Sequence, residues 1–394
     1  MTTTSRNLLL LACCQALLLT NSAGLITMNG LVGYALAPSR ALATLGVTTY
    51  VLGSALTTMP LSRWMARVGR RRGFMAGAVI NVFGCGLAAL AMYLHSFALY
   101  CTATAVIGIY NAIGLQYRFA ATEVAAPEHR ASATSLVLAG GVVGGFLGPW
   151  MTRAGQHLLP SEFLGSFALL ALTALVALGL QSQVDVPPPQ VGAHVRDGRR
   201  LGLIARQPAF LVAALSGALG YGLMNLLMTA TPLAMTFCAH PYGAAVLVIQ
   251  LHVLGMYAPA FFTGRLIERF DVLTVIGAGI AVMVAGSVVA LAGITVGHFV
   301  LSMVLVGLGW NFMYTGGTVL LGEAHSVEEK ATAQGANDFL VFSTMGVSSL
   351  TSGALVSGAG WEVMNWVAIA VLGAGALGVL AFAQHRARTR LQPA

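Results

Sequence analysis

The sequence predicts an all-α integral membrane protein, in which twelve membrane-spanning helices form two pseudo-symmetric halves of six. Three observations lead to this fold class: the composition, the spacing of long apolar runs, and an internal repeat. Hydrophobic residues make up 57% of the 394 residues and charged residues only 8%, and the mean hydropathy is +0.82. A soluble domain carries roughly a quarter charged residues. The composition therefore excludes a soluble protein and predicts a chain embedded in a lipid bilayer.

Apolar runs long enough to cross a bilayer recur along the whole chain, since about 20 residues make one crossing. We expect halves at 1–182 and 208–394, joined by a cytoplasmic linker at 183–207 that contains three consecutive prolines and four arginines. The predicted spans are 8–33, 41–61, 74–94, 97–120, 131–151 and 163–182 in the first half, and 208–234, 244–264, 273–294, 298–321, 331–356 and 361–383 in the second.

The arginines indicate how the chain crosses the membrane. The loops on one side hold only Arg40 and Arg153. The loops on the other side, with the C-terminal end, hold Arg63, Arg67, Arg70, Arg71, Arg72, Arg196, Arg199, Arg200, Arg206, Arg265, Arg269, Arg386, Arg388 and Arg390. This asymmetry is the positive-inside pattern, and it predicts that both termini are cytoplasmic. The net charge of +8 thus reflects membrane orientation, and no nucleic-acid partner is expected.

The two halves repeat one another. Arg63 and Arg67 recur 202 residues later as Arg265 and Arg269. A second set recurs at an offset of 200, in the fourth span of each half and the loop after it: Asn111, Glu123, Glu128, Arg130 and Ala131 become Asn311, Glu323, Glu328, Lys330 and Ala331. Parallel repeats of six helices around an axis along the membrane normal are the architecture of major facilitator transporters, with the substrate site between the halves.

The loop at 62–71 resembles the major facilitator loop motif G-x-x-x-D-R-x-G-R-R. Ser62 and Ala66 replace its Gly and Asp, so the charge pairing that the Asp supplies in the family is missing here, but the second copy has an acid, Glu268, at that place. The resemblance implies a cytoplasmic gate formed by Arg63, Arg67, Gly69, Arg70, Arg71, Glu268 and Arg269. We expect Asp338, about two turns into the eleventh span, to pair with a gate arginine such as Arg67; the alternative is that it carries a coupled proton.

Two neighbouring spans each carry a pair of soft ligands four residues apart: Met224 with Met228, and His252 with Met256. A spacing of four places both side chains on one helix face. Thioether and imidazole groups suit copper, above all Cu(I), and an ionisable residue inside a span is costly and usually functional. Methionine is also an ordinary filler of apolar helices, and a histidine can simply bond a neighbouring helix. At 1.5 Å per residue, the antiparallel spans bring both pairs to similar depth, which predicts a four-donor site between the halves.

These pairs resemble those of the CcoA-like copper importers, which are bacterial major facilitator proteins that supply copper to the cbb-type cytochrome c oxidase. The resemblance implies import of copper across the bacterial inner membrane through Met224, Met228, His252 and Met256, and handover to periplasmic or cytoplasmic copper chaperones. It also implies a thiol ligand at Cys238, near the outer mouth. Copper would be the transported substrate, and no cofactor is expected.

Two other functions remain open. The chain has no G-x-x-x-x-G-K-[ST] motif, so we expect no nucleotide partner, no enzyme activity, and transport driven by an ion or substrate gradient. The first alternative is a transporter of a small organic solute, such as a vitamin or a drug, on the same fold, with the methionines as packing. The second is a copper receptor or oxidase assembly partner that binds metal without transporting it.

Overall fold

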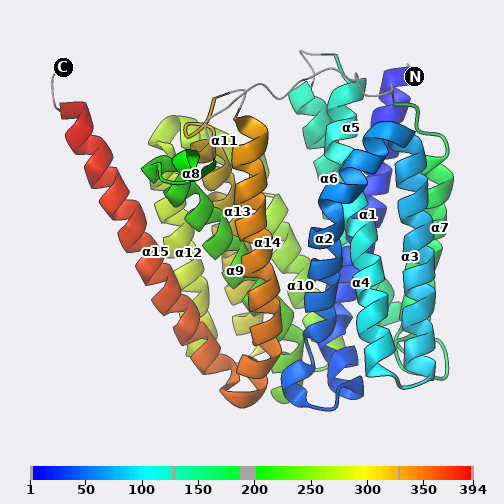
Figure 1. Cartoon of the computed structure of the whole chain (residues 1–394). Coiled ribbons are helices and arrows are strands. Elements are labelled where there is room, and N and C mark those ends of the chain that lie inside the picture. The colour runs from blue at the N-terminus through cyan, green and yellow to red at the C-terminus, as the bar shows by residue number, and fades with distance from the viewer. Residues whose placement is uncertain (1–2, 127–129, 187–200, 327–328, 392–394) are drawn as a thin grey trace. The chain divides into compact units, whose positions relative to one another are not determined.

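The computed structural model of the chain describes residues 3–126, 130–186, 201–326 and 329–391, and all regular elements in these ranges are helices. Some predictions concern residues outside the described ranges, namely Pro187–Pro189, Arg196, Arg199, Arg200, Glu128 and Glu328. The elements are α1 (Thr3–Leu36), η1 (Arg40–Leu42), α2 (Leu45–Val68), α3 (Arg70–Tyr93), α4 (Phe97–Gly114), α5 (Tyr117–Val124), α6 (Arg130–Gly155), α7 (Leu164–Gln181), α8 (Leu201–Ile204), α9 (Pro208–Phe237), α10 (Tyr242–Tyr257), α11 (Ala260–Phe270), α12 (Val272–Ala292), α13 (Val296–Leu321), α14 (Lys330–Gly358) and α15 (Gly360–Leu391) (Figure 1).

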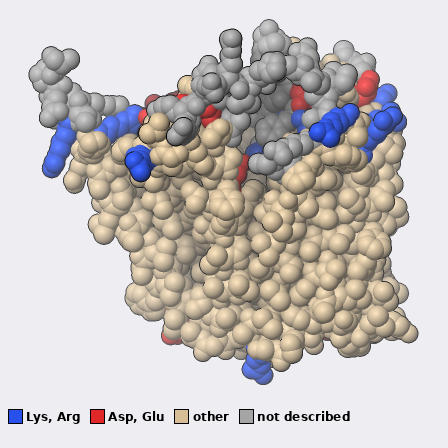
Figure 2. Space-filling model, in the orientation of Figure 1, with Lys and Arg blue, Asp and Glu red and all other residues tan. Residues whose placement is uncertain are grey.

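The predicted all-α membrane fold is confirmed. Within the described ranges, ten helices are long and apolar enough to cross a membrane, and α10 and α11 meet the same criteria as a pair, with a bend of 42° between them. Helix α6 is 26 residues long, or ~39 Å, which is also enough for a crossing. Figure 2 shows charged side chains gathered mainly at one end of the helices and a broad surface without charge along their length. A surface of this kind fits the hydrocarbon of a bilayer.

The chain forms two compact units. Unit 1 comprises 1–191 with 232–250, and unit 2 comprises 192–231 with 251–394. The division passes through α9 and α10, so that the end of α9 and the start of α10 pack with unit 1. The boundaries of the predicted halves and of the linker stay predictions.

In unit 1, α1 packs directly against α6 because a row of glycines on α6 lets the two backbones approach. Gly140, Gly144 and Gly148 lie four residues apart on one face of α6. A Cβ added at these positions would collide with the carbonyl oxygens of α1, at Ala12, Ala16 and Thr20 respectively. Small residues at this spacing are the usual means of close helix packing in membranes.

In unit 2, α13 is the central helix. A Cβ at Gly309 would meet the Gly279 carbonyl oxygen of α12 at 2.6 Å, and one at Gly317 would meet the Ala213 carbonyl oxygen of α9 at 2.9 Å. Gly307 approaches α10 in the same way. Helix α13 therefore touches α9, α10 and α12, and side chains from α9 and α10 meet on its surface.

Candidate functional site

The structure places all four predicted soft ligands in unit 2, with their side chains buried. Met224 and Met228 lie on α9 and are 1% and 6% exposed, while His252 and Met256 lie on α10 and are 0% and 5% exposed. The predicted eighth span, 244–264, was expected to be one continuous helix. It is interrupted instead between Tyr257 and Ala260, where Pro259 cannot continue the hydrogen-bond ladder. Met256 thus sits in the last turn before the bend.

His252 is anchored at one ring nitrogen and free at the other. Its Nδ1 lies 2.6 Å from the carbonyl oxygen of Met303 on α13. Because a carbonyl only accepts, Nδ1 carries the hydrogen and Nε2 of the neutral ring holds a lone pair. Nε2 is buried and has no hydrogen-bond partner in the part of the chain that the structure describes. His252 therefore does bond a neighbouring helix, α13, through Nδ1. Its second ring nitrogen, Nε2, remains available to a ligand.

Met303 links the two helices that carry the soft ligands. Thr231 of α9, one turn beyond Met228, donates from Oγ1 to the Met303 sulfur at 3.3 Å, and His252 bonds the same residue from α10. The meeting of the four predicted donors around one ion stays a prediction. A single Met in an apolar helix carries no signal in sequence, so Met303 was not foreseen. Among the described residues, no group of three or more His, Cys, Asp or Glu side chains could hold a metal ion.

Cys238 follows the end of α9 and is partly exposed, and burial raises the pKa of its thiol above the ordinary value. It belongs to unit 1, whereas the Met and His pairs belong to unit 2. A ligand role for Cys238 stays a prediction.

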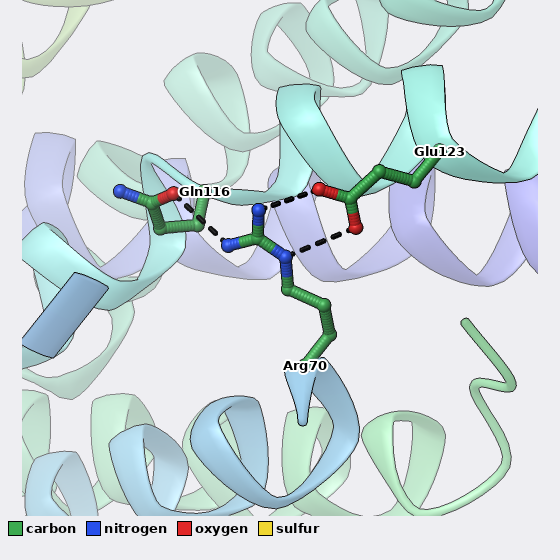
Figure 3. Close-up of polar contacts among 3 residues, drawn as sticks. All are labelled: Arg70, Gln116 and Glu123. Atoms are coloured by element: carbon green, nitrogen blue, oxygen red, sulfur yellow. Dashed lines mark hydrogen bonds and ion pairs between the residues drawn. The ribbon is translucent and has the colours of Figure 1, made fainter. Parts of the chain in front are cut away.

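The motif loop of unit 1 is held by an ion pair (Figure 3). Arg70, the first residue of α3, donates to both carboxylate oxygens of Glu123 on α5, from Nη2 at 2.6 Å and from Nε at 3.1 Å, and also to Gln116 Oε1 at 3.1 Å. Such two-pronged pairs are the strong form of the interaction. Gly69 turns the chain between α2 and α3 with φ of +90°, a conformation that favours glycine. The sequence repeat identified Glu123 as a repeated residue, but it did not predict that Arg70 would be its partner.

The other predicted gate residues are on the surface of their units. Arg67 and Arg71 are exposed, as are Glu268 and Arg269 on α11, while the side chain of Arg63 lies outside what the structure describes. Asp338 is exposed on α14 and accepts a hydrogen bond from Asn337 Nδ2 at 3.3 Å. Its pairing with Arg67, and the gate as a whole, stay predictions.

The repeated asparagines make corresponding contacts in the two units, whereas the repeated glutamates have partners at different places. Glu123 pairs with Arg70 at the start of α3, and Glu323 pairs with Arg386 of the last helix, α15, at 3.1 Å. Asn111 donates to Ser54 Oγ of α2 at 3.0 Å, and Asn311 accepts from Thr263 Oγ1 of α11 at 2.6 Å and donates to the Met256 carbonyl oxygen of α10 at 2.8 Å. In each unit, the repeated asparagine therefore ties the fourth span to the second.

Unit 2 also contains an aromatic cluster that sequence reasoning missed. Tyr221 of α9, Tyr257 of α10, and Trp310 and Tyr314 of α13 have ring centroids 5.3–5.9 Å apart in four pairs. The three tyrosines are half-buried, and Trp310 is 5% exposed. The spacing of four between Trp310 and Tyr314 was the only signal in sequence, because the other two rings come from distant helices.

The comparisons with known proteins agree with this architecture. A family profile described as Major Facilitator Superfamily matches residues 11–256. The riboflavin transporter RfnT of Brucella anthropi is 37% identical over 374 residues, which is 94% of each chain. The uncharacterized MFS-type transporter YdeG of Bacillus subtilis is 28% identical over 359 residues, 87% of this chain and 84% of that one.

Solved structures show the same fold. The nucleoside transporter NupG superposes with a TM-score of 0.78 at 12% identity, covering 95% of this chain and 99% of that one. A bacterial homologue of the lysosomal transporter Spinster, in its inward-facing and occupied conformation, gives a TM-score of 0.75 at 15% identity over the whole of both chains. At these identities the likeness concerns the fold alone.

Proposed function

Because the chain belongs to the Major Facilitator Superfamily and is therefore a secondary transporter and not an enzyme, we propose that it carries a small organic solute of the vitamin class, and that riboflavin is that solute. The observation that carries this proposal is the 37% identity to a riboflavin transporter over 94% of both chains. Identity spread over the whole length covers the helices that line a transport path as well as those that face lipid. It supports the vitamin alternative better than the copper interpretation.

Transport would proceed by alternating access, in which one half rocks against the other around a central site. The proposed halves are 1–182 and 208–394, with both termini in the cytoplasm of a bacterium and the spans in its inner membrane. The ion pairs Arg70–Glu123 and Arg386–Glu323 each lie inside one unit. They would keep the ends of neighbouring helices together, so that each unit moves as a body.

Copper import is the second candidate, and the free Nε2 of His252 is the observation that favours it. A metal-binding histidine commonly donates its other N–H to a backbone carbonyl, as His252 does to Met303. With Met224, Met228 and Met256, it would bind Cu(I) as cargo, which the cbb-type oxidase would then receive. The copper interpretation depends on these few side chains, whereas the vitamin interpretation depends on the whole chain.

Parallel uptake assays would separate the two candidates. Radioactive riboflavin and radioactive copper are offered to cells that lack their own importers of both, with this chain, an empty vector, or a Met224→Leu plus His252→Leu double variant. We expect the chain to accumulate riboflavin above the vector, and no copper above it. Copper uptake that is lost in a normally expressed double variant would reverse the assignment. Riboflavin uptake no higher than that of the vector would refute the vitamin proposal.

A further inference from the structure

The aromatic cluster of unit 2 has the composition of a site for a flat ring. Resting on the proposed transport of riboflavin, we propose that Tyr221, Tyr257, Trp310 and Tyr314 form the subsite that takes the planar isoalloxazine ring of the solute. None of the four side chains carries a charge at neutral pH, and all four are electron-rich rings. They suit a neutral, electron-poor heterocycle, which stacks on such rings whatever its substituents.

The four rings brace one another. Trp310 and Tyr314, one turn apart on α13, are nearly parallel, with centroids 5.3 Å apart and 8° between their planes. Tyr221 meets both of them edge-on, at 5.3 Å and angles of 85° and 80°, and Tyr257 meets Trp310 edge-on at 5.9 Å and 69°. Offset-stacked and edge-to-face arrangements are the favourable ones for aromatic pairs. The rings are therefore held in place before a ligand arrives, which reduces the entropy lost on binding.

The cluster lies at the depth where the solute of such a transporter binds. Tyr221 is thirteen residues into α9, and Trp310 is fourteen residues into α13, so each lies roughly 20 Å along its helix. The two helices start from opposite sides of the membrane, because they are an odd-numbered and an even-numbered span. Their rings therefore meet near the middle of the bilayer, where solute sites of this architecture are found.

Trp310 adds a hydrogen-bond donor without an acceptor. The side chain is 95% buried, and the indole N–H has no partner among the described residues. A buried donor left unpaired is costly, so this position favours a ligand that brings an acceptor. The edge of an isoalloxazine ring carries carbonyl oxygens and ring nitrogens that accept. The half-buried tyrosines would contact the face of the ring through the part of their surface that is exposed, and Trp310 would supply the directional bond.

Flavin fluorescence tests the inference, because stacking on tyrosine or tryptophan quenches it by electron transfer. Riboflavin is titrated into the full chain in lipid nanodiscs, and bound ligand is measured by equilibrium dialysis beside its emission. We expect bound riboflavin to be quenched by the parent protein. Tyr221→Leu and Tyr314→Leu should each raise the Kd by about tenfold and restore part of the emission. Trp310→Phe, which keeps a ring but removes the N–H, should raise the Kd by a few-fold and keep the quenching.

Trp361→Phe is the matched control. Trp361 lies in the same unit, is 8% exposed, packs on Phe299, and also has an indole N–H without a partner among the described residues. It does not belong to the cluster, so its variant should bind and quench like the parent. A larger Kd in Trp361→Phe than in Trp310→Phe would overturn the inference.

The outcomes separate this inference from the proposed function. A parent protein that binds no riboflavin overturns both. A parent that binds riboflavin without quenching it overturns the subsite alone, and this measurement needs no variant to fold. Folded Tyr221→Leu and Tyr314→Leu variants that bind and quench like the parent also overturn the subsite, while riboflavin transport stands.

Discussion

The contact between α10 and α13 depends on a missing side chain at Gly307. A Cβ added there would lie 2.6 Å from the His252 carbonyl oxygen and 2.9 Å from the Met256 nitrogen. The first distance is about 0.8 Å short of the 3.4 Å at which ordinary contact begins. Both obstacles are backbone atoms and cannot rotate away, so Gly307→Ala must push the two helices apart.

Moving α10 and α13 apart lowers the free energy of unfolding, and the contacts at Gly307 show by roughly how much. Overpacking of a close contact costs about 1–3 kcal/mol, and the bond from Asn311 Nδ2 to the Met256 carbonyl oxygen, 2.8 Å long, lies one turn away and would lengthen. For a unit of this size, each kcal/mol lowers the melting temperature by roughly 2–4 °C. We therefore expect Gly307→Ala to melt several degrees below the parent, and to transport less, because His252 and Tyr257 move with α10.

Thermal unfolding of the purified protein, followed by tryptophan emission, measures this effect. The control is Gly346→Ala on α14, where an added Cβ has nothing within 4 Å, so the same chemical change should leave the melting temperature near that of the parent. Equal melting temperatures for Gly307→Ala and Gly346→Ala would refute the close packing of α10 against α13 and the site geometry built on it.

Three further predictions concern single contacts. A double-mutant cycle of Arg70→Gln and Glu123→Gln should give a coupling free energy of about 0.5–1 kcal/mol in thermal unfolding, because the side chains are 13% and 31% exposed; additive effects would contradict the pair. Asn311→Leu should destabilise by about 1–2 kcal/mol, since it removes bonds to Thr263 and α10; a variant as stable as the parent would contradict them. Because burial raises the pKa of the Cys238 thiol, and the thiolate is the reactive form, maleimide should label it more slowly at pH 7 than free cysteine. The labelling rate should keep rising at pH values where that of free cysteine has levelled off, and a rate that levels off at the same pH as that of free cysteine would contradict the raised pKa.

The fold was predictable because membranes constrain spans by length and charge. The third and tenth predicted spans, 74–94 and 298–321, match α3 (Arg70–Tyr93) and α13 (Val296–Leu321) within a few residues. The difference at the start of α3 has a physical cause: the helix continues past the hydrocarbon, where Arg71 and Arg72 are exposed and Arg70 pairs with Glu123. The break after Tyr257 was missed because average hydropathy does not register one proline.

The candidate site was less predictable, because its parts come from separate helices. Periodicity correctly placed Met224 with Met228 and His252 with Met256 on one helix each, and all four proved buried. The partners supplied by α13 were not predicted, since nothing in the local sequence of Met303 or Trp310 says which helices will face them. Such contacts depend on close helix approaches at glycines, such as Gly307, Gly309 and Gly317 of α13, which bring together helices that lie far apart in the sequence.

Both candidate functions can use the same chemical group, the Nε2 atom of His252. This decides which substitution can distinguish copper transport from riboflavin transport. The free Nε2 of His252 can bind Cu(I), but it can equally accept a hydrogen bond from an N–H at the edge of a heterocyclic solute. Loss of transport on changing His252 therefore fits either function. A thioether differs: it is a strong ligand for soft metals and a poor hydrogen-bond acceptor. Met224→Leu nearly conserves volume and removes only the sulfur. It would therefore abolish uptake if copper were the cargo, whereas riboflavin uptake, which we expect, should stay close to normal. The methionine, not the histidine, is the residue that tells the two functions apart.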